Sequence, residues 1–256
     1  MSESSGIFAL WYREFKVFTR EKSRVISSII NPILWLLIIG GGLGASVDIK
    51  GINYQTFIYP GVLAQTILFS SIFFGVYIVW DRKIDFLKEV LVAPISRTSI
   101  FIGKILGGAT DALIQICILL LIGFAFTTLG IIPGLNLNVV TFLLSLIVLL
   151  VMTTGLVSIG LIIGSQMESP EGFQLIVSFL VFPLFFLSGA LFPINNLPSW
   201  MAPFTFLDPL TYAVDALRGI ILGASHFSVA YDFGIISIFS IALIVVGTQA
   251  FKRMKV

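Results

Sequence analysis

Long windows without charged residues constrain this chain more than any other feature. A helix of roughly 20 apolar residues crosses a bilayer core, and the sequence contains six windows of about this length. Five cover residues 25–47, 59–80, 139–164, 173–192 and 233–251, and one begins near Ile105 and ends before the turn-forming pair Pro133-Gly134. Charged residues make up 11% of the chain, against roughly 25% in an average soluble domain. The sequence therefore predicts an all-α membrane protein with six transmembrane helices.

Lysine and arginine gather on one predicted side of these helices. Thirteen of the 15 precede the first helix, lie between the second and third, or follow the sixth, and only Lys50 and Arg218 fall opposite. Cytoplasmic loops retain such residues, so we expect a multi-pass protein of the cell (cytoplasmic) membrane with both termini cytoplasmic. The net charge of +2 is too small and too dispersed for a nucleic-acid surface, and no nucleic-acid partner is expected.

Residues 1–24 have the pattern of an amphipathic helix. At roughly 100° per residue, aromatic residues share one face and basic residues the other: Phe8, Trp11, Phe15 and Phe18 against Arg13, Lys16 and Arg20. We expect this segment to lie in the inner membrane interface. The alternative is an extension of the first transmembrane helix that packs against other helices.

Sequence signals of catalysis are absent. The chain has no G-x-x-x-x-G-K-[ST] phosphate loop and no H-E-x-x-H, C-x-x-C or G-x-S-x-G motif, and its only histidine, His226, has no second metal ligand nearby. We expect no catalytic residue, no metal and no cofactor bound by this chain. Asp111 is the one charged residue expected inside a span, about 10 Å along the third helix from Lys104. Such a residue is a candidate intramembrane polar site. The alternative is a solvated or paired acid near a helix end.

The loop 81–97 between the second and third helices contains a predicted short amphipathic helix. Its apolar residues recur at helical spacing, an i, i+3 ion pair lies beside them, and Pro94 ends the helix. The residues concerned are Ile84, Asp85, Leu87, Lys88, Glu89 and Leu91. Ser96 then caps the third transmembrane helix. Either a cytoplasmic partner protein or the membrane surface must cover the apolar residues.

The segment 193–228 is apolar but too interrupted by proline to span. Asp208-Pro209 is a cap and first-turn signature that opens a helix through about Leu222. Asp215 and Arg218 stand three apart, so we expect them to pair. The candidate residues of this outer re-entrant segment are Pro198, Trp200, Asp208, Pro209, Asp215 and Arg218. We expect it to enter the outer leaflet and to be buried against a second copy or the other helices.

Four pairs of glycines recur at a spacing of four residues. They are Gly40/Gly44, Gly103/Gly107, Gly160/Gly164 and Gly219/Gly223. Because this spacing permits close helix contact, we expect one of the four pairs to lie at a dimer interface.

Two stretches of the chain resemble a known family. They are residues 89–115, EVLVAPISRTSIFIGKILGGATDALIQ, and residues 185–223, FFLSGALFPINNLPSWMAPFTFLDPLTYAVDALRGIILG. Both are similar to permease subunits of ABC type-2 exporters, in the branch of the daunorubicin-resistance and nodulation-factor exporters, and the six-span layout extends the similarity over essentially the whole chain. The resemblance implies a single permease domain, not an enzyme. It would assemble with a second copy of itself and with two copies of a separate ATP-binding-cassette ATPase, which holds ATP and Mg.

The resemblance also implies roles for particular segments. Residues 84–92 would be a coupling helix that docks on the ATPase, the loop 166–172 with Glu168 and Glu171 a second contact, and residues 198–222 re-entrant helices. The implied function is export of an amphiphilic substrate, a drug, lipid or lipid-linked glycan, out of the cytoplasm or inner leaflet. The alternatives are an ion-coupled secondary transporter or channel that uses Asp111, or a membrane scaffold without transport.

Overall fold

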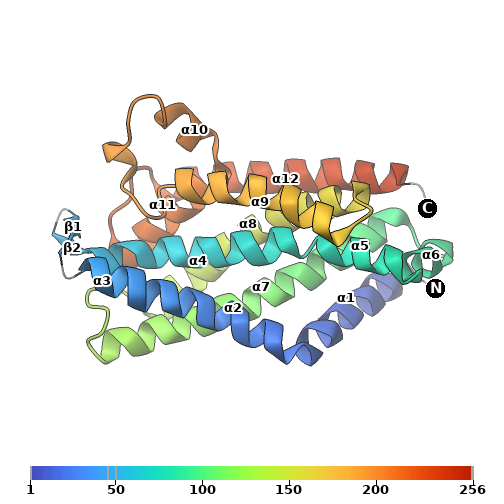
Figure 1. Ribbon diagram of the computed structural model, residues 1–256, viewed down its shortest axis with the longest axis horizontal. Coiled ribbons are helices and arrows are strands. Elements are labelled where there is room, and N and C mark those ends of the chain that lie inside the picture. The colour runs from blue at the N-terminus through green and yellow to red at the C-terminus, as the bar shows by residue number, and fades with distance from the viewer. Residues whose placement is uncertain (1, 45, 50, 255–256) are drawn as a thin grey trace.

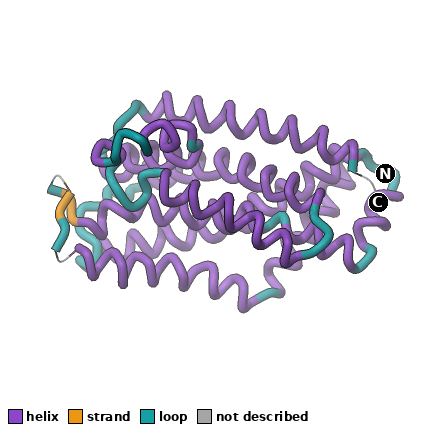
Figure 2. Tube along the Cα trace, turned by 45° about the horizontal axis from the view of Figure 1, so that its top comes forward, coloured by secondary structure: helices purple, strands orange, loops and turns teal. Residues whose placement is uncertain are grey.

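A computed structural model describes residues 2–44, 46–49 and 51–254. Lys50 and Lys255, which entered the charge count, lie outside the described residues. The described chain forms an elongated bundle whose long helices run along one direction (Figure 1). Loops gather at its two ends, and a two-stranded hairpin lies at the end away from both termini (Figure 2). We call the end with the termini the basic end and the other the hairpin end.

Six segments of the described chain are long and apolar enough to cross a membrane, so the prediction of a six-span α-helical membrane protein is confirmed. The first contains α2 (Lys22–Leu34), the π-helix η1 (Trp35–Gly40) and α3 (Gly41–Gly44), and the second contains α4 (Tyr54–Phe73) and α5 (Val76–Lys83). The others are α7 (Arg97–Thr128), α8 (Val139–Gln166), α9 (Pro170–Leu187) and α12 (Val229–Arg253). Both termini lie at one end, as an even number of spans requires (Figure 1).

Short elements complete the fold. They are α1 (Glu3–Arg20), the antiparallel strands β1 (Asp48–Ile49) and β2 (Ile52–Asn53), α6 (Phe86–Val92), the 3-10 turn η2 (Ile194–Asn196), α10 (Ala202–Leu207) and α11 (Pro209–Leu222). The strands, η2, α10 and α11 lie towards the hairpin end, whereas α6 lies at the basic end (Figure 1).

Local sequence signals set the ends of the long helices. The side chain of Ser96 accepts a hydrogen bond from the backbone N–H of Ser99, so the predicted cap is confirmed and α7 begins before its apolar window. Asn138 and Thr141 form a reciprocal capping box at α8. In the first span, Pro32 lies inside α2. Proline removes a backbone donor and disturbs the preceding turn. The regular α-helical hydrogen bonding is therefore interrupted at Pro32, and the π-helix η1 begins shortly after it.

The second span is the centre of the bundle. In its most apolar window 72% of the residues are buried, against 11% in the first span, 28% in the fifth and 17% in the sixth. α4 packs against α7, α8, α9 and α11. The three poorly buried spans therefore present apolar surfaces that lipid or another chain must cover.

Glycines allow the central helices to approach closely, but within this chain. A Cβ at Gly160 or Gly164 of α8 would clash with backbone carbonyls of Ile72 or Gly75. Gly103 and Gly107 lie against α1, and Gly40 and Gly44 against Gln55 and Asn53. Gly223 ends α11 with φ of 67°, a conformation that favours glycine. Three of the four pairs thus make contacts within the chain, and the expectation that one pair lies at a dimer interface stays a prediction.

The N-terminal helix is separate from the first span, since the chain bends between α1 and α2 (Figure 1). The alternative of an extended first span is therefore wrong in its continuity, whereas the packing against other helices that it expected is found. α1 packs on α7 and buries Gly6, Leu10, Glu14 and Phe18. Phe8, Trp11 and Phe15 share one face as predicted, with ring centres 5.5 and 6.0 Å apart along it. The predicted basic face needs correction, because Arg13 reaches inward to an ion pair with Asp81.

Candidate functional site

The two segments predicted to contact a partner lie together at the basic end. Arg82 at the end of α5 donates hydrogen bonds of 2.7 Å to the carbonyls of Ser165 and Met167, and so fixes the end of α8 beside α5. Glu168 and Glu171 follow in exposed positions. Arg82 thereby holds the loop before α6 next to the loop before α9. No sequence feature had indicated that these two loops are neighbours.

The short helix α6 differs from its prediction. Asp85 has a positive φ of 58°, so the helix begins at Phe86 and Ile84 does not share its face. Leu87 is 3% exposed and turned inward, whereas Ile84 is 64% exposed. The i, i+3 pair is confirmed, because Lys88 Nζ lies 2.7 Å from Asp85 Oδ1. The outward surface at α6 is thus formed by Lys88, Glu89 and Val92 of the helix and by Ile84, which precedes it, and Leu91 is half-buried.

Charged side chains hold several helix ends at the basic end. The carboxylate of Glu3 accepts hydrogen bonds from the backbone N–H and hydroxyl of Ser96 at the start of α7. Hydrogen bonds from the Ser99 and Ser96 side chains and from the Ser96 backbone lower the pKa of Glu3. Arg97 donates to the carbonyl of Lys252 at the end of α12. An acid at a helix start and a base at a helix end both complement the helix dipole.

Four charged residues that no sequence feature brought together form a cluster, in which Glu14, Asp81 and Lys104 are buried and Arg13 is 29% exposed. Lys104 Nζ of α7 lies 2.8 Å from Glu14 Oε1 of α1 and 2.5 Å from Asp81 Oδ2 of α5. Arg13 completes the cluster, 2.6 Å from Asp81 and 2.8 Å from Glu14. The Arg13 guanidinium also lies 3.9 Å from the ring centre of Phe86. We call these four residues the buried charge cluster, and it joins α1, α5 and α7 to the first residue of α6.

Lys104 was expected among the charges of the loop between the second and third spans, and this placement is wrong. It is 1% exposed within α7. The available signal was local, because Lys104 lies eight residues inside the helix that Ser96 caps and has Phe101 and Ile105 as neighbours. Nothing local indicated its partners, which are 90 and 23 residues away.

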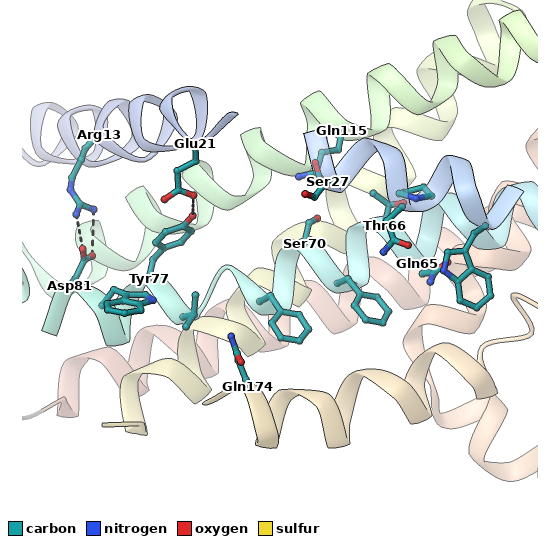
Figure 3. A pocket seen from close by; sticks show the side chains of 18 of the residues that line it. Arg13, Glu21, Ser27, Gln65, Thr66, Ser70, Tyr77, Asp81, Gln115 and Gln174 are labelled. Atoms are coloured by element: carbon teal, nitrogen blue, oxygen red, sulfur yellow. Dashed lines mark hydrogen bonds and ion pairs between the residues drawn. The ribbon is translucent and has the colours of Figure 1, made fainter. Parts of the chain in front are cut away.

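A groove of about 690 Å³ lies between the first two spans. α2 forms one wall and α4 with α5 the other, while α7 contributes Gln115 and α9 contributes Gln174 (Figure 3). Aromatic side chains of Trp35, Phe69 and Tyr77 alternate along it with hydroxyl and amide groups. Arg13 and Asp81 of the buried charge cluster lie at its basic end, so the groove begins next to α6. No feature of the sequence indicated this groove.

At the hairpin end, Asp208 caps α11 as predicted, since its carboxylate accepts a 2.9 Å hydrogen bond from the Leu210 N–H. Burial raises the pKa of Asp208 to about 8. Pro209 follows in the first turn of α11. Pro198 and Trp200 precede α10 in exposed positions.

The predicted pair of Asp215 and Arg218 does not form. Asp215 instead accepts hydrogen bonds of 2.7–2.9 Å from the backbone N–H groups of His226 and Phe227. Arg218 donates to the Gly189 carbonyl at 2.9 Å and lies 4.0 Å from the Phe57 ring centre. Burial lowers the pKa of Arg218 to about 10, and the charge of Asp215 opposes this shift. Tertiary partners thus replace the local pair and fasten α11 to α4 and to the turn after α9.

Asp111, the predicted intramembrane site, lies on α7 and is 2% exposed. It is not among the residues that line the groove. An ion-relay role for Asp111 remains a prediction.

Comparison with known proteins identifies the family. The family profile described as ABC-2 type transporter matches residues 5–222, most of the chain. The chain belongs to the ABC-2 type transporter family. As a member of this family it is a permease subunit of an ABC transporter and associates with an ATP-binding subunit.

Three relatives illustrate the range of this family. The ycf38 transport permease of Cyanophora paradoxa is 31% identical over 83% of this chain and 72% of the relative. Nodulation protein J of Rhizobium leguminosarum bv. viciae is 23% identical over 96% of this chain and 93% of the relative. The doxorubicin resistance permease DrrC of Mycobacterium tuberculosis is 26% identical over 80% and 73%. The resemblance given by the two sequence stretches is confirmed.

Proposed function

We propose that this ABC-2 type permease is half of an ATP-driven exporter that moves an amphiphile from the cytoplasm or inner leaflet outwards. The groove between α2 and α4 is the observation that carries this proposal. It combines aromatic and hydrogen-bonding side chains at membrane depth, as a site for a molecule with both an apolar and a polar part requires. Relatives named for doxorubicin resistance and for nodulation support a role in transport out of the cell.

The basic end would face the cytoplasm of a cell membrane. Its described arginine and lysine side chains include Arg82, Lys83, Lys88, Arg97 and Lys252, and cytoplasmic loops retain such residues. The segment 81–97 would then be a coupling loop, α1 would lie in the inner interface, and the segment 193–228 would lie in the outer leaflet.

The separate ATPase, in two copies with its ATP and Mg, would dock on two neighbouring surfaces at this end. One is the outward surface of α6 with Ile84 and Val92, and the other is the loop with Glu168 and Glu171. A push on α6 would pass to α5 through the turn at Asp85. It would also pass to α1 through the contact of Phe86 with Arg13. Both walls of the groove would move, because α5 forms one wall and α2 follows α1.

A second copy of the chain would complete the pathway. The first, fifth and sixth spans bury only 11%, 28% and 17% of their most apolar windows, so the single chain leaves large apolar faces uncovered. A homodimer would cover part of them and lipid the remainder.

Reconstitution tests this function. The permease is co-expressed with a candidate ATP-binding-cassette ATPase from the same genome, co-purified, and placed in vesicles with a fluorescent amphiphile. Transport that requires ATP and stops when the ATPase lysine of the phosphate loop is replaced is the expected result. Transport that persists without ATP, follows an ion gradient and disappears in Asp111→Asn would instead establish a secondary transporter.

A further inference from the structure

The groove between α2 and α4 has charges only at one end. Among its described lining residues, Arg13, Glu21 and Asp81 are charged. Arg13 and Asp81 pair at 2.6 Å, and Glu21 accepts a 2.9 Å hydrogen bond from the Tyr77 hydroxyl. All three lie at the basic end of the groove (Figure 3). The described side chains deeper in the groove are uncharged.

Hydrogen-bonding groups in the deeper part come from four different helices. α2 contributes Asn31, α4 contributes Gln65 and Ser70, α7 contributes Gln115 and α9 contributes Gln174. Ser70 points from α4 towards α2, and Gln174 points from α9 towards the second span (Figure 3). Amide and hydroxyl groups both donate and accept hydrogen bonds. The groove therefore matches a ligand that does the same.

Two of these groups are buried without satisfying their oxygen atoms. Gln65 is 8% exposed and Gln115 is 1% exposed, and Oε1 of each lacks a hydrogen-bond donor within the described chain. The Ser70 hydroxyl is also without a partner. An unsatisfied buried polar group destabilises the folded protein. These oxygens are enclosed in the groove wall, whereas their side chains line the groove. A ligand that donates hydroxyl or amide hydrogens satisfies them when the side chains turn towards it.

Charged head groups fit the same space poorly. A cation deep in the groove would lose its hydration without gaining a carboxylate. Asp81 already holds Arg13 and Lys104, and Glu21 lies at the basic end, where it accepts a hydrogen bond from Tyr77. An anion would likewise find the guanidinium of Arg13 committed to Asp81 and Glu14. Desolvating an unpaired charge costs far more than desolvating a hydroxyl group that finds a partner.

We propose that the groove selects amphiphiles whose head group is uncharged and carries several hydroxyl or amide groups. The head group hydrogen bonds to Gln65, Ser70 and Gln115, and the acyl chain lies against the aromatic side chains of Trp35 and Phe69. This selectivity deepens the proposed function and rests on it only for the direction of transport.

Binding of three lipids with identical acyl chains tests the selectivity. The permease is placed in phosphatidylcholine nanodiscs with brominated diacylglycerol that carries a diglucosyl, phosphate or trimethylammonium head group. Trp11→Phe with Trp200→Phe leaves Trp35 and Trp80, both of which line the groove, as fluorescent reporters. The diglucosyl lipid is expected to quench the tryptophan fluorescence at a mole fraction at least about tenfold lower than either charged lipid. This ratio corresponds to a difference of about 1.4 kcal/mol in binding free energy.

Glutamine variants connect the preference to the groove. Gln65→Leu and Gln115→Leu are each expected to abolish it, and Gln65→Glu to shift it towards the trimethylammonium lipid. Gln166→Leu is the matched control, since Gln166 is exposed at the end of α8 and does not line the groove. Melting temperatures of all variants identify those that fail to fold. Equal quenching by the three lipids, or a preference that survives both leucine variants in folded protein, would overturn the proposed selectivity.

The outcome separates this selectivity from export itself. Transport is measured on the same variants together with the ATPase. ATP-dependent transport without head-group preference refutes the selectivity and leaves the exporter intact. Head-group preference without ATP-dependent transport refutes the exporter and leaves the binding site intact.

Discussion

Lys104 of α7 and Glu14 of α1 form an ion pair of 2.8 Å, although 90 residues separate them and each side chain is 1% exposed. Since Asp81 of α5 shares the same ammonium group, one cation neutralises carboxylates from two helices. The pair fastens the N-terminal helix to the second and third spans at the place where α6 begins.

Loss of this cation should destabilise the protein strongly. Lys104→Met leaves Glu14 and Asp81 buried with only Arg13 as a partner, and breaking a buried pair costs about 3–5 kcal/mol. Unfolding in detergent measures the loss. Lys16→Met, at an exposed position of α1, is the control and should change little. Lys104→Met combined with Glu14→Met should recover part of the stability, and a single variant as stable as the parent would contradict the importance of the pair.

The exposed residues of α6, not its buried ones, should be needed for ATPase coupling. Ile84 and Val92 are 64% and 84% exposed, so Ile84→Asp or Val92→Asp should reduce ATP-dependent transport at least about tenfold without lowering the melting temperature. Leu129→Asp, at the exposed residue that follows the far end of α7, should leave transport unchanged. Leu87→Asp should unfold the region, because Leu87 is buried. Normal co-purification and transport in both exposed variants would exclude α6 as the docking surface.

Arg82 should order the loop after α8. Arg82→Gln removes its charge-assisted hydrogen bonds to the Ser165 and Met167 carbonyls, each worth about 1.5–3 kcal/mol. The backbone amides of residues 167–169, 171 and 172 should then exchange with deuterium faster. Lys83→Gln, a neighbouring exposed position, should leave their exchange as it is. The same exchange in both variants would mean that these hydrogen bonds do not restrain the loop.

Stability should fall as the pH rises towards 8 because of Asp208. Burial raises the pKa of this carboxyl group from 3.8 to about 8, so the folded protein holds a proton that the unfolded chain releases above about pH 4. The folded state therefore binds more protons between these values, and the free energy of unfolding decreases with pH. Asp208→Asn retains an oxygen for the Leu210 N–H and should flatten this dependence of the melting temperature. An equal slope in both proteins would show that Asp208 ionises normally.

The sequence by itself determined the spans, their number and the helix caps. These features depend on residues close together in the chain: charge-free windows long enough for a bilayer, Ser96 before α7, and Asp208-Pro209 before α11. The i, i+3 pair of Asp85 and Lys88 also depends on helical spacing alone. The absence of nucleotide-binding and catalytic motifs, with two family-like stretches, indicated the permease class.

Tertiary structure alone decided which side chains meet. The pair expected from Asp215 and Arg218 is replaced by backbone partners, because the fold brings the N–H groups of His226 and Phe227 to Asp215 and the Gly189 carbonyl to Arg218. The positive φ of Asp85 separated Ile84 from Leu87 despite their helical spacing. The buried charge cluster and the groove depend on how α1, α2 and α4 fold back upon one another. Lipid removes water's drive for apolar burial, so hydropathy defines which helices cross the membrane and leaves their mutual packing to specific polar and glycine contacts.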